Sequence, residues 1–430
     1  MMPDSTQKPL WTGRVFTPPT PPQNMRQIET LVVGGGIAGL STALHLSRAG
    51  KEVAVMEAGT TLGLATRASA GIVTGQLVRN TPHSILKHMG PETGGRLLEA
   101  VAASPREIFS LIRDENLDCD AIQAGFLAPF FNSEEKWQAA VTDWARWRDD
   151  VDLIDAAETR RLSGCRDYLG AICDRSGGGI NPAAYADELG RCVIKHGGTI
   201  LFDTHVEKIE PLAHAGASRW RVWHSGGTTD ARHVVLAANG GNALLHPALK
   251  QSLLPLPVLE LATAPLPHDL REKILPAGHT LTDLSTDVFS IRYSPEGKLI
   301  TAMPASGNAV DWPRLTASVN DRCTRAIPGW RHQEIENAWI GTAWLFSDCV
   351  PRMPLLAPGL LAIQACNGRG LAINTVAGAD AARFVESEGR DLPRLPATLP
   401  RSISGFAIAR HAPRLIMTAA RVWGRLKKMC

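Results

Sequence analysis

The sequence has no apolar run long enough to cross a bilayer as a helix, so we expect no transmembrane segment. Its first residues lack the basic start and apolar core of a signal peptide and instead hold the extended stretch PPTPP at residues 18–22. The eight cysteines show no C-x-x-C pair and no regular spacing, which argues against a disulfide framework and against a metal site. We therefore expect a cytoplasmic protein whose thiols are free and mostly buried.

Charge is also modest, with 20% charged residues and a formal net charge of +3. The positive excess lies in residues 392–430, which hold eight Lys or Arg and no Asp or Glu. Residues 413–429 can be drawn as an amphipathic helix, with Leu415 and Trp423 on one face and Arg421 and Lys428 on another. Such a helix either docks on its own domain or lies on an anionic membrane surface, so peripheral contact with the inner face of a membrane stays open. No nucleic acid partner is expected.

The most informative segment is residues 29–59, which read ETLVVGGGIAGLSTALHLSRAGKEVAVMEAG. Residues 30–33 suit one buried strand, residues 37–49 repeat apolar positions with helical spacing, and residues 53–56 suit a second strand. Gly34, Gly36 and Gly39 join the first strand to the helix in a G-x-G-x-x-G pattern, and Glu57 follows the last of them by 18 positions. This complete strand, turn, helix and strand unit predicts a dinucleotide site.

Each position in this unit has a physical role. Gly34 permits the tight turn, the missing Cβ of Gly36 lets the backbone approach a pyrophosphate, and Gly39 lets the helix pack close to the sheet. The first turn of the helix supplies free N–H groups and a positive dipole to the phosphates. Glu57 would accept hydrogen bonds from a ribose diol, and its charge argues against NADP. FAD and NAD both fit this segment taken alone.

The remaining chain alternates between two patterns. Residues 177–245 return to helices and parallel-type strands, whereas residues 253–302 hold short, alternating, proline-bounded strands with a hairpin turn between Tyr293 and Leu299. A further helix is expected to begin at Ser104 and Pro105. We predict an α/β fold in which a discontinuous Rossmann-like nucleotide domain accompanies an α+β substrate domain with an antiparallel sheet.

The predicted boundaries follow these patterns. Residues 28–100, 177–245 and 335–390 form the nucleotide domain, and residues 101–176 and 246–334 form the substrate domain. Residues 1–27 form a Pro-rich arm that Trp11 pins to the body, and residues 391–430 form a basic helical tail.

Four motifs, in the order found in the family, resemble the superfamily of FAD-dependent D-amino-acid, glycine and sarcosine oxidases. Within that superfamily, the resemblance is strongest to gamma-glutamylputrescine oxidase-like proteins. The motifs are the glycine motif, ATRASAGIV at 65–73, GGGINPAAYADEL at 177–189, and WIGTAWLFSDCVPRMPLL at 339–356 followed by CNGRGLA at 366–372. The resemblance covers roughly residues 9–410. It implies FAD instead of NAD, and a flavin-binding domain of the glutathione-reductase type.

The resemblance also implies which residues meet the cofactor. Backbone N–H groups of residues 368–371, at a helix N-terminus, would face the negative charge of a reduced flavin. Val206 would contact the adenine or ribose through its backbone, and Arg67 would face the flavin or its phosphates unless it is a surface arginine. The full predicted FAD set is Gly34, Gly36, Ile37, Ala38, Gly39, Glu57, Arg67, Gly71, Ile72, Val206, Ala237, Gly341, Gly368, Arg369, Gly370 and Leu371.

The sequence departs from the family at the substrate end. The arginine that holds a substrate carboxylate just after W-x-G is replaced by Ala343, so a simple α-amino acid bound in that way is doubtful. An amine or a larger apolar substrate stacked on Trp344 fits better, although Trp344 could equally be a core residue. Arg292 could supply the missing carboxylate contact. Lys298 falls where sarcosine oxidases place a lysine that promotes oxygen reduction, unless it is a solvated turn residue.

These features predict an FAD-dependent oxidoreductase that oxidises the C–N bond of an amine or amino acid by hydride transfer to flavin N5, giving an imine. Oxygen or a quinone would accept the electrons. We expect non-covalent FAD, because Cys349 lies out of register with the cysteine that links flavin in some relatives. The alternatives are a 2-hydroxy-acid dehydrogenase of the same fold and a flavin-containing assembly protein without turnover.

Overall fold

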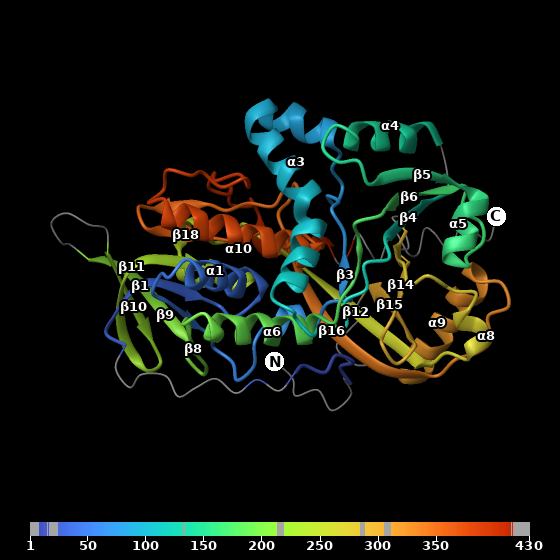
Figure 1. Ribbon diagram of the computed structural model, residues 1–430, viewed down its shortest axis with the longest axis horizontal. Coiled ribbons are helices and arrows are strands. Elements are labelled where there is room, and N and C mark those ends of the chain that lie inside the picture. The colour runs from blue at the N-terminus through green and yellow to red at the C-terminus, as the bar shows by residue number, and fades with distance from the viewer. Residues whose placement is uncertain are drawn as a thin grey trace.

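The computed structural model describes residues 8–14, 16, 25–131, 134–212, 219–283, 289–304, 311–413 and 415. Within them the chain forms two eight-stranded sheets and one two-stranded sheet. Each large sheet belongs to one half of the molecule, and helix α3 (Pro82–Asp114) runs between the halves (Figure 1). The predicted mixed α/β fold, with a parallel and an antiparallel part, is confirmed.

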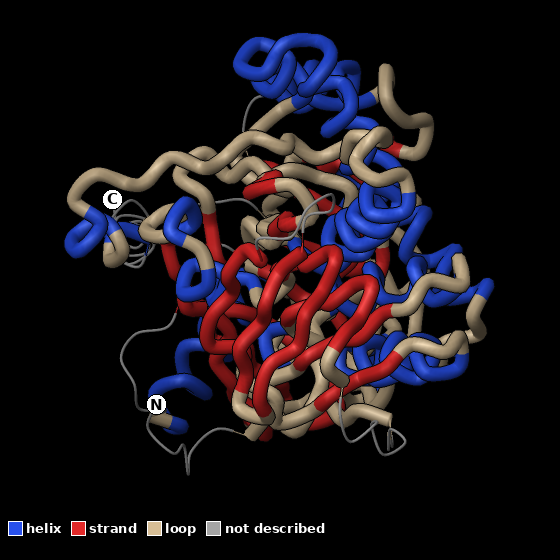
Figure 2. The backbone as a smooth tube through the Cα atoms, turned by 90° about the vertical axis from the view of Figure 1, so that its left-hand side faces the viewer, coloured by secondary structure: helices blue, strands red, loops and turns tan. Residues whose placement is uncertain are grey.

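The first sheet is parallel at its centre, with strands that are buried on both faces. Its order is β17 (Leu355–Ala357), β18 (Leu360–Ala362), β11 (Gly227–Leu236), β1 (Gln27–Val33), β2 (Val53–Met56) and β8 (Thr199–Leu201), with β9 (Val206–Leu212) and β10 (Arg219–His224) joined to β11 as an antiparallel meander. Seen from that end, the strands lie side by side with helices along one side (Figure 2).

Alternate side chains of this sheet enter two different cores. Val32, Val55 and Val235 pack under α1 (Ile37–Arg48), α6 (Pro182–Lys195) and α10 (Gly370–Glu386). Leu31 and Leu236 pack against the meander on the opposite face. The sequence predictions for this half are confirmed at the first helix, the second strand and α6, whose N-cap Asn181 accepts from the N–H groups of Ala183 and Ala184.

The second sheet is mostly antiparallel and forms the other half. Its order is β16 (Ile335–Leu345), β12 (Leu254–Pro265), β15 (Lys298–Pro304), β14 (Ser290–Tyr293), β13 (Thr280–Thr282), β4 (Phe126–Phe130), β6 (Gly170–Asp174) and β5 (Val151–Asp155). The expected hairpin is present, because Tyr293 pairs with Leu299 across β14 and β15. One face packs on α8 (His268–Arg271) and α9 (Trp312–Ala326).

Two sequence predictions in this region are wrong. Residues 335–345 were assigned to the nucleotide domain, but β16 pairs with β12 along its length and belongs to the antiparallel sheet. Ser104 does not cap a new helix, because it lies inside α3 and donates its hydroxyl to the Val101 carbonyl. Helix α3 instead begins with a capping box at Thr81 and kinks at Gly90. Pro105 lies inside this helix, so the predicted helix start at Ser104 and Pro105 does not exist.

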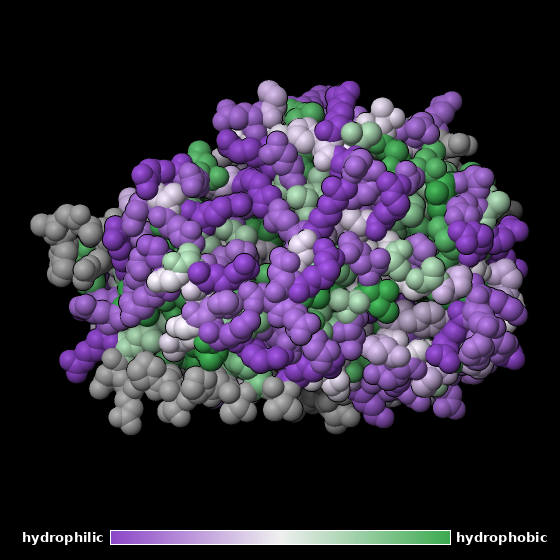
Figure 3. All heavy atoms as spheres, viewed as in Figure 1, coloured by the Kyte–Doolittle hydropathy of each residue, from purple (hydrophilic) through white to green (hydrophobic). Residues whose placement is uncertain are grey.

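The remaining elements are short or peripheral. They are α2 (Leu64–Arg67), α4 (Glu134–Trp144), α5 (Ala156–Ser163), α7 (Asn242–Leu245), α11 (Phe406–Ala409) and the small sheet of β3 (Ile72–Val73) with β7 (Gly178–Gly179). None of the helices in the described ranges has the length and apolar character needed to cross a bilayer. The face in Figure 3 is mostly hydrophilic, with hydrophobic residues in small separate groups. The PPTPP stretch and the predicted amphipathic helix beyond Leu415 lie outside the described residues.

Candidate active site

The glycine turn after β1 has the shape that its sequence predicts. Gly34 has a φ of +109°, and a Cβ there would come within 2.8 Å of the Ala237 carbonyl oxygen. A Cβ on Gly39 would overlap the Gly34 carbonyl oxygen, so this position is closed by the protein itself. A Cβ on Gly36 would meet nothing within 4 Å, so the space beside Gly36 is open. The open position is the one that a pyrophosphate would approach.

Glu57 ties this turn to the neighbouring strands. Its carboxylate accepts from the Gly35 N–H at 2.7 Å and from the Gly59 N–H at 2.9 Å. Its carbonyl accepts from Thr204, two residues before Val206 at the start of β9. The predicted ribose and adenine contacts therefore meet at one edge of the sheet, and each carboxylate oxygen keeps a second lone pair for a ribose hydroxyl.

A second helix begins at the same edge. Helix α10 starts at Gly370 with Arg369 as its N-cap, and no side chain among the described residues caps it or α1. Because β1 and β18 run parallel to β11 and each precedes one of these helices, both uncapped N-termini lie at the carboxyl edge of the sheet. The Ser41 hydroxyl donates to the Thr375 carbonyl and holds α1 against α10. Free N–H groups and two helix dipoles at one edge form an anion-binding surface.

The loop of residues 65–73 closes the site from the second sheet. A Cβ on Gly341 would approach the Ala68 carbonyl oxygen to 2.7 Å, and one on Gly71 would overlap the Arg292 guanidinium. Ile72 pairs with Gly179 in the small sheet. The loop is therefore pressed directly on the face of β14 and β16 that points away from α9.

Arg292 is the group that fastens this loop. Its Nη1 donates to the carbonyls of Ala70, Gly71 and Ile180, and its Nε donates to Tyr293. The guanidinium also lies 5.0 Å from the centre of the Trp11 ring. Burial lowers the pKa of Arg292 to about 10, yet the group stays charged at neutral pH.

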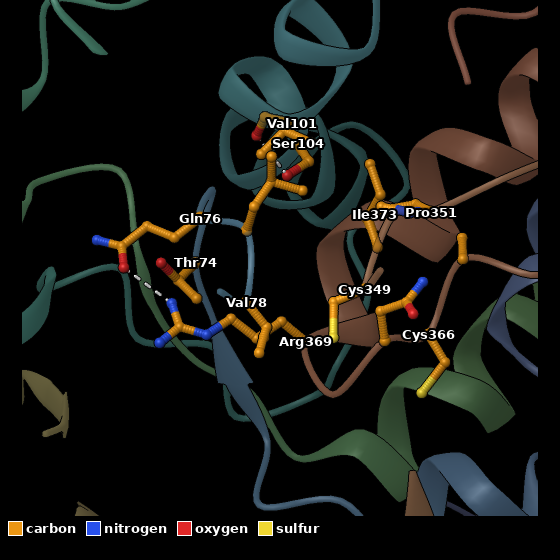
Figure 4. A pocket seen from close by; sticks show the side chains of 13 residues that line it. Thr74, Gln76, Val78, Val101, Ser104, Cys349, Pro351, Cys366, Arg369 and Ile373 are labelled. Atoms are coloured by element: carbon orange, nitrogen blue, oxygen red, sulfur yellow. Dashed lines mark hydrogen bonds between the residues drawn. The ribbon is translucent and has the colours of Figure 1, made fainter. Parts of the chain in front are cut away.

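Arg67 and Arg369 are both engaged with protein groups. The Arg67 guanidinium pairs with Asp187 and donates to the Leu62 carbonyl. Arg369 reaches toward the other half, where its Nη1 donates to Gln76 at 2.9 Å (Figure 4). Its guanidinium also lies 5.1 Å from the centre of the Phe126 ring. Its Nη2 is buried without a partner, and burial lowers its pKa to about 10. Flavin contact for either side chain stays a prediction.

The arginine also lines a small enclosed pocket between the halves. The labelled lining side chains come from the loop after β3, from α3 and from the segments around residues 349–351 and 366–373 (Figure 4). Cys349 and Cys366 lie there as free thiols, and burial raises the pKa of Cys349. A thiol of raised pKa is a weaker nucleophile, in keeping with a flavin held without a covalent bond.

The two other candidate catalytic residues occupy the ends of strands. The Lys298 ammonium bonds Glu336 at 2.6 Å and Asn337 at 2.9 Å at the start of β15. The Trp344 ring lies so close to Gly240 that a Cβ there would overlap it. Lys298 is thus held by protein partners and Trp344 packs on Gly240, in the turn that follows β11, so their predicted roles toward oxygen and substrate stay predictions.

The site as a whole suits a flavin dinucleotide. The open position beside Gly36, the two uncapped helix N-termini and the buried, unpartnered Nδ2 of Asn367 all lie where such a cofactor would need room and donors. Among the described residues, no group of three or more His, Cys, Asp or Glu side chains is placed to hold a metal ion. The fold and site together define a dinucleotide-binding protein.

Comparison with known proteins gives the family. Residues 29–383 match the family described as FAD dependent oxidoreductase (DAO), and the chain belongs to this family. Members bind FAD, typically without a covalent link, so FAD is the cofactor of this chain and the protein is an enzyme of the flavin class. The resemblance inferred from the four motifs is confirmed.

Individual relatives agree with this assignment. The chain is similar to gamma-glutamylputrescine oxidoreductase of Escherichia coli strain K12, at 26% identity over 362 residues, covering 81% of this chain and 82% of that protein. Its fold is similar to glycine oxidase from Geobacillus kaustophilus, with a TM-score of 0.71, 20% identity and coverage of 88% and 100%. L-proline dehydrogenase from P. horikoshii has the same TM-score of 0.71 at 18% identity, covering 86% of this chain and 96% of its own.

Several residues at the site were not found from the sequence. Trp11 was expected only to pin the arm, which is confirmed by its burial and by its Nε1–H donation to Ser69 at 2.8 Å, but its stacking on Arg292 was not foreseen. Glu260 and Asp187 were not singled out. A signal for Glu260 was present in the sequence, because it is the acidic residue of the otherwise apolar stretch VLELATAPL. The alternation of a strand puts it on the same face as Ala262.

Proposed function

We propose that this enzyme uses FAD to oxidise the C–N bond of an amine or amino acid to an imine, with oxygen or a quinone as the electron acceptor. The observation that carries the proposal is membership of the family over residues 29–383, together with relatives named for amino compounds, gamma-glutamylputrescine and glycine. Bound FAD would supply the hydride acceptor, its N5 atom. The protein must then position the substrate carbon and keep water away.

The residues facing the loop of residues 65–73 support these two tasks. Trp339, Ala262 and Ile300 are buried and pack with Trp11 in one apolar cluster beside the loop. An apolar environment strengthens electrostatic interactions inside the site and excludes water from the imine. The Trp339 Nε1–H donates to the Ala68 carbonyl at 3.3 Å and holds the cluster against the loop.

The lack of a free arginine among the described residues at the substrate end disfavours a simple α-amino acid as the substrate. Ala343 stands where the family resemblance implies an arginine, and the described contacts of Arg292 already use Nε and Nη1 on backbone carbonyls. A buried carboxylate needs a charged partner. We therefore infer an amine, or an amino acid held by a different group, as the substrate.

An anaerobic substrate screen tests this proposal. The purified yellow protein is mixed with panels of amines, amino acids and 2-hydroxy acids while flavin absorbance is followed. Bleaching by at least one amino compound is expected, and release of peroxide in air would then identify oxygen as the acceptor. Bleaching by hydroxy acids alone would overturn the proposal in favour of a hydroxy-acid dehydrogenase, and no bleaching by any panel would contradict turnover of this kind.

A further inference from the structure

Glu260 is a buried acid on the face of the second sheet that meets the cofactor loop. It lies on β12 opposite Trp339 on β16 and opposite Ala302 on β15. Its face is set by its neighbours, since Leu259 and Leu261 enter the core under α9 whereas Ala262 packs with Trp11, Ala183 and Trp339. The residue is 6% exposed, so its carboxyl group is almost completely surrounded by protein.

The carboxyl group has no partner that would explain its burial. Oε2 is buried without a hydrogen bond, and no ion pair within 4.0 Å joins Glu260 to a cation anywhere in the described chain. Arg292 lies on the same face and acts on Glu260 through its charge, but its donors go to backbone carbonyls. Burial raises the pKa of Glu260 to about 8. An unpaired buried carboxyl is costly, so such a group is retained where a ligand completes it.

We propose that Glu260 binds a protonated nitrogen of the substrate, and that the substrate class is a diamine or a compound with an equivalent second amino group. This rests on the proposed function and narrows it. The reacting nitrogen must be neutral, because its lone pair assists the departure of hydride from the neighbouring carbon. The cation that Glu260 accepts is therefore the other nitrogen.

The surroundings of Glu260 suit a cation. Trp339 lies directly across the strand pair on the same face, and side chains in this position lie within contact of one another. Aromatic faces attract cations, most strongly when both are desolvated. Ala343, on the same face of β16 and paired with Leu256, carries no charge, and the donors of Arg292, the cation on this face that acts on Glu260, go to backbone carbonyls.

The test compares diamines of three to six carbons with monoamines of matching length and with 4-aminobutanoate. Binding to the FAD-loaded protein is followed under anaerobic conditions by the perturbation of the flavin spectrum. We expect the wild type to prefer the best diamine over its monoamine by at least about tenfold, and Glu260→Gln to reduce that preference to about twofold or less. Glu272→Gln, an exposed glutamate after α8, is the matched control and should keep it.

A pH series on the wild type gives a second measurement that needs no variant. Because the ionised carboxyl is the form that binds a cation, the preference for diamines should grow as pH rises from about 6.5 to 8.5, through the pKa of about 8. Arg292 is the charged group that acts on Glu260 from the packed elements, and its pKa of about 10 keeps it constant in this range. A preference independent of pH would overturn the inference even if Glu260→Gln failed to fold.

The outcomes separate this inference from the proposed function. A diamine preference that survives Glu260→Gln, or 4-aminobutanoate binding as tightly as the diamine, would overturn the role of Glu260 while amine-driven bleaching could still stand. Glu260-dependent diamine binding without bleaching by any amine would uphold the cation site and refute amine oxidation.

Discussion

Gly36 and Gly39 lie within one turn of each other but face different surroundings. The space beside Gly39 is filled by the Gly34 carbonyl, and the space beside Gly36 is empty of protein atoms. A methyl group at Gly39 would strain the fold, whereas a methyl group at Gly36 would meet only the cofactor. The two glycines therefore act on different properties, fold stability and FAD affinity.

A pair of alanine substitutions separates these properties. Gly36→Ala should leave the melting temperature of the FAD-free protein within a few degrees of wild type and weaken FAD binding at least about tenfold. Gly39→Ala should destabilise the FAD-free protein by about 1–3 kcal/mol, because of overpacking between α1 and β1. Calorimetry of the FAD-free proteins and fluorescence titration with FAD measure the two effects. Equal FAD affinity in Gly36→Ala and wild type would contradict the placement of the pyrophosphate.

At the scale of elements, the N-terminal arm acts as a strap across both halves. Lys8 forms a bridge with Ala338 in the second sheet, Trp11 bonds the cofactor loop at Ser69, and the Thr12 carbonyl accepts from Asn181 at the start of α6. Arg14 then forms ion pairs with Asp118 and Asp120. The arm thus contacts the loop of residues 65–73 directly, through the bond of Trp11 to Ser69.

Trp11→Ala should remove this contact. Loss of a buried indole costs about 3–5 kcal/mol in a core, and here it also removes the stacking partner of Arg292. We expect lower stability together with weaker FAD binding, measured by thermal denaturation with and without added FAD. Trp223→Ala, which removes a 41% exposed indole on β10, is the control and should change neither by much. An unchanged FAD affinity in Trp11→Ala would show that the strap does not support the cofactor loop.

At the scale of the whole molecule, a buried charge network joins the two halves near α3. Arg148 pairs with Asp150 and Asp174, and Asp174 accepts from the Gly75 N–H in the loop after β3 at 3.2 Å. Burial alone would raise the pKa of Asp150, but the hydrogen bonds and charge of Arg148 outweigh it and hold that pKa below its ordinary value. The hydrogen bonds of this network are complete only when the loop at Gly75 is packed against Arg148 and Asp174.

Arg148→Met should therefore unfold the protein more easily. Removing Arg148 leaves the buried Asp174 without its cation and leaves Asp150 with Arg106 as its ion-pair partner, a loss of about 3–5 kcal/mol. Urea denaturation at pH 7 measures it, and the deficit should shrink as the pH falls and Asp150 takes up a proton. Arg161→Met removes an exposed pair with Glu158 and should change stability by less than about 1 kcal/mol. A deficit in Arg148→Met no larger than this control would refute the structural role of the network.

Local patterns in the sequence were sufficient for the dinucleotide half. The glycine turn, β2, α6 and the start of α10 each depend on residues within a few positions of one another, so the chain order alone carries them. The sheet of β16 was predicted wrongly because it depends on pairing with the distant strand β12. The start of α3 was also predicted wrongly, although its capping box at Thr81 is local. A serine before a proline reads as a helix start unless the preceding turns are already helical.

What the sequence by itself determined is the fold class and the position of the glycine turn, because backbone conformation and hydrophobic periodicity are local properties. The choice of FAD over NAD came from the resemblance of the four motifs to a known family. Only the tertiary structure decided that Arg292 is committed to the cofactor loop, that Arg67 pairs with Asp187, and that Glu260 stands unpaired beside Trp339. The positions of Arg292 and Glu260 depend on the register between strands far apart in the chain, and a shift of one residue would turn each side chain to the other face. The pair of Arg67 with Asp187 depends on the packing of α2 against α6.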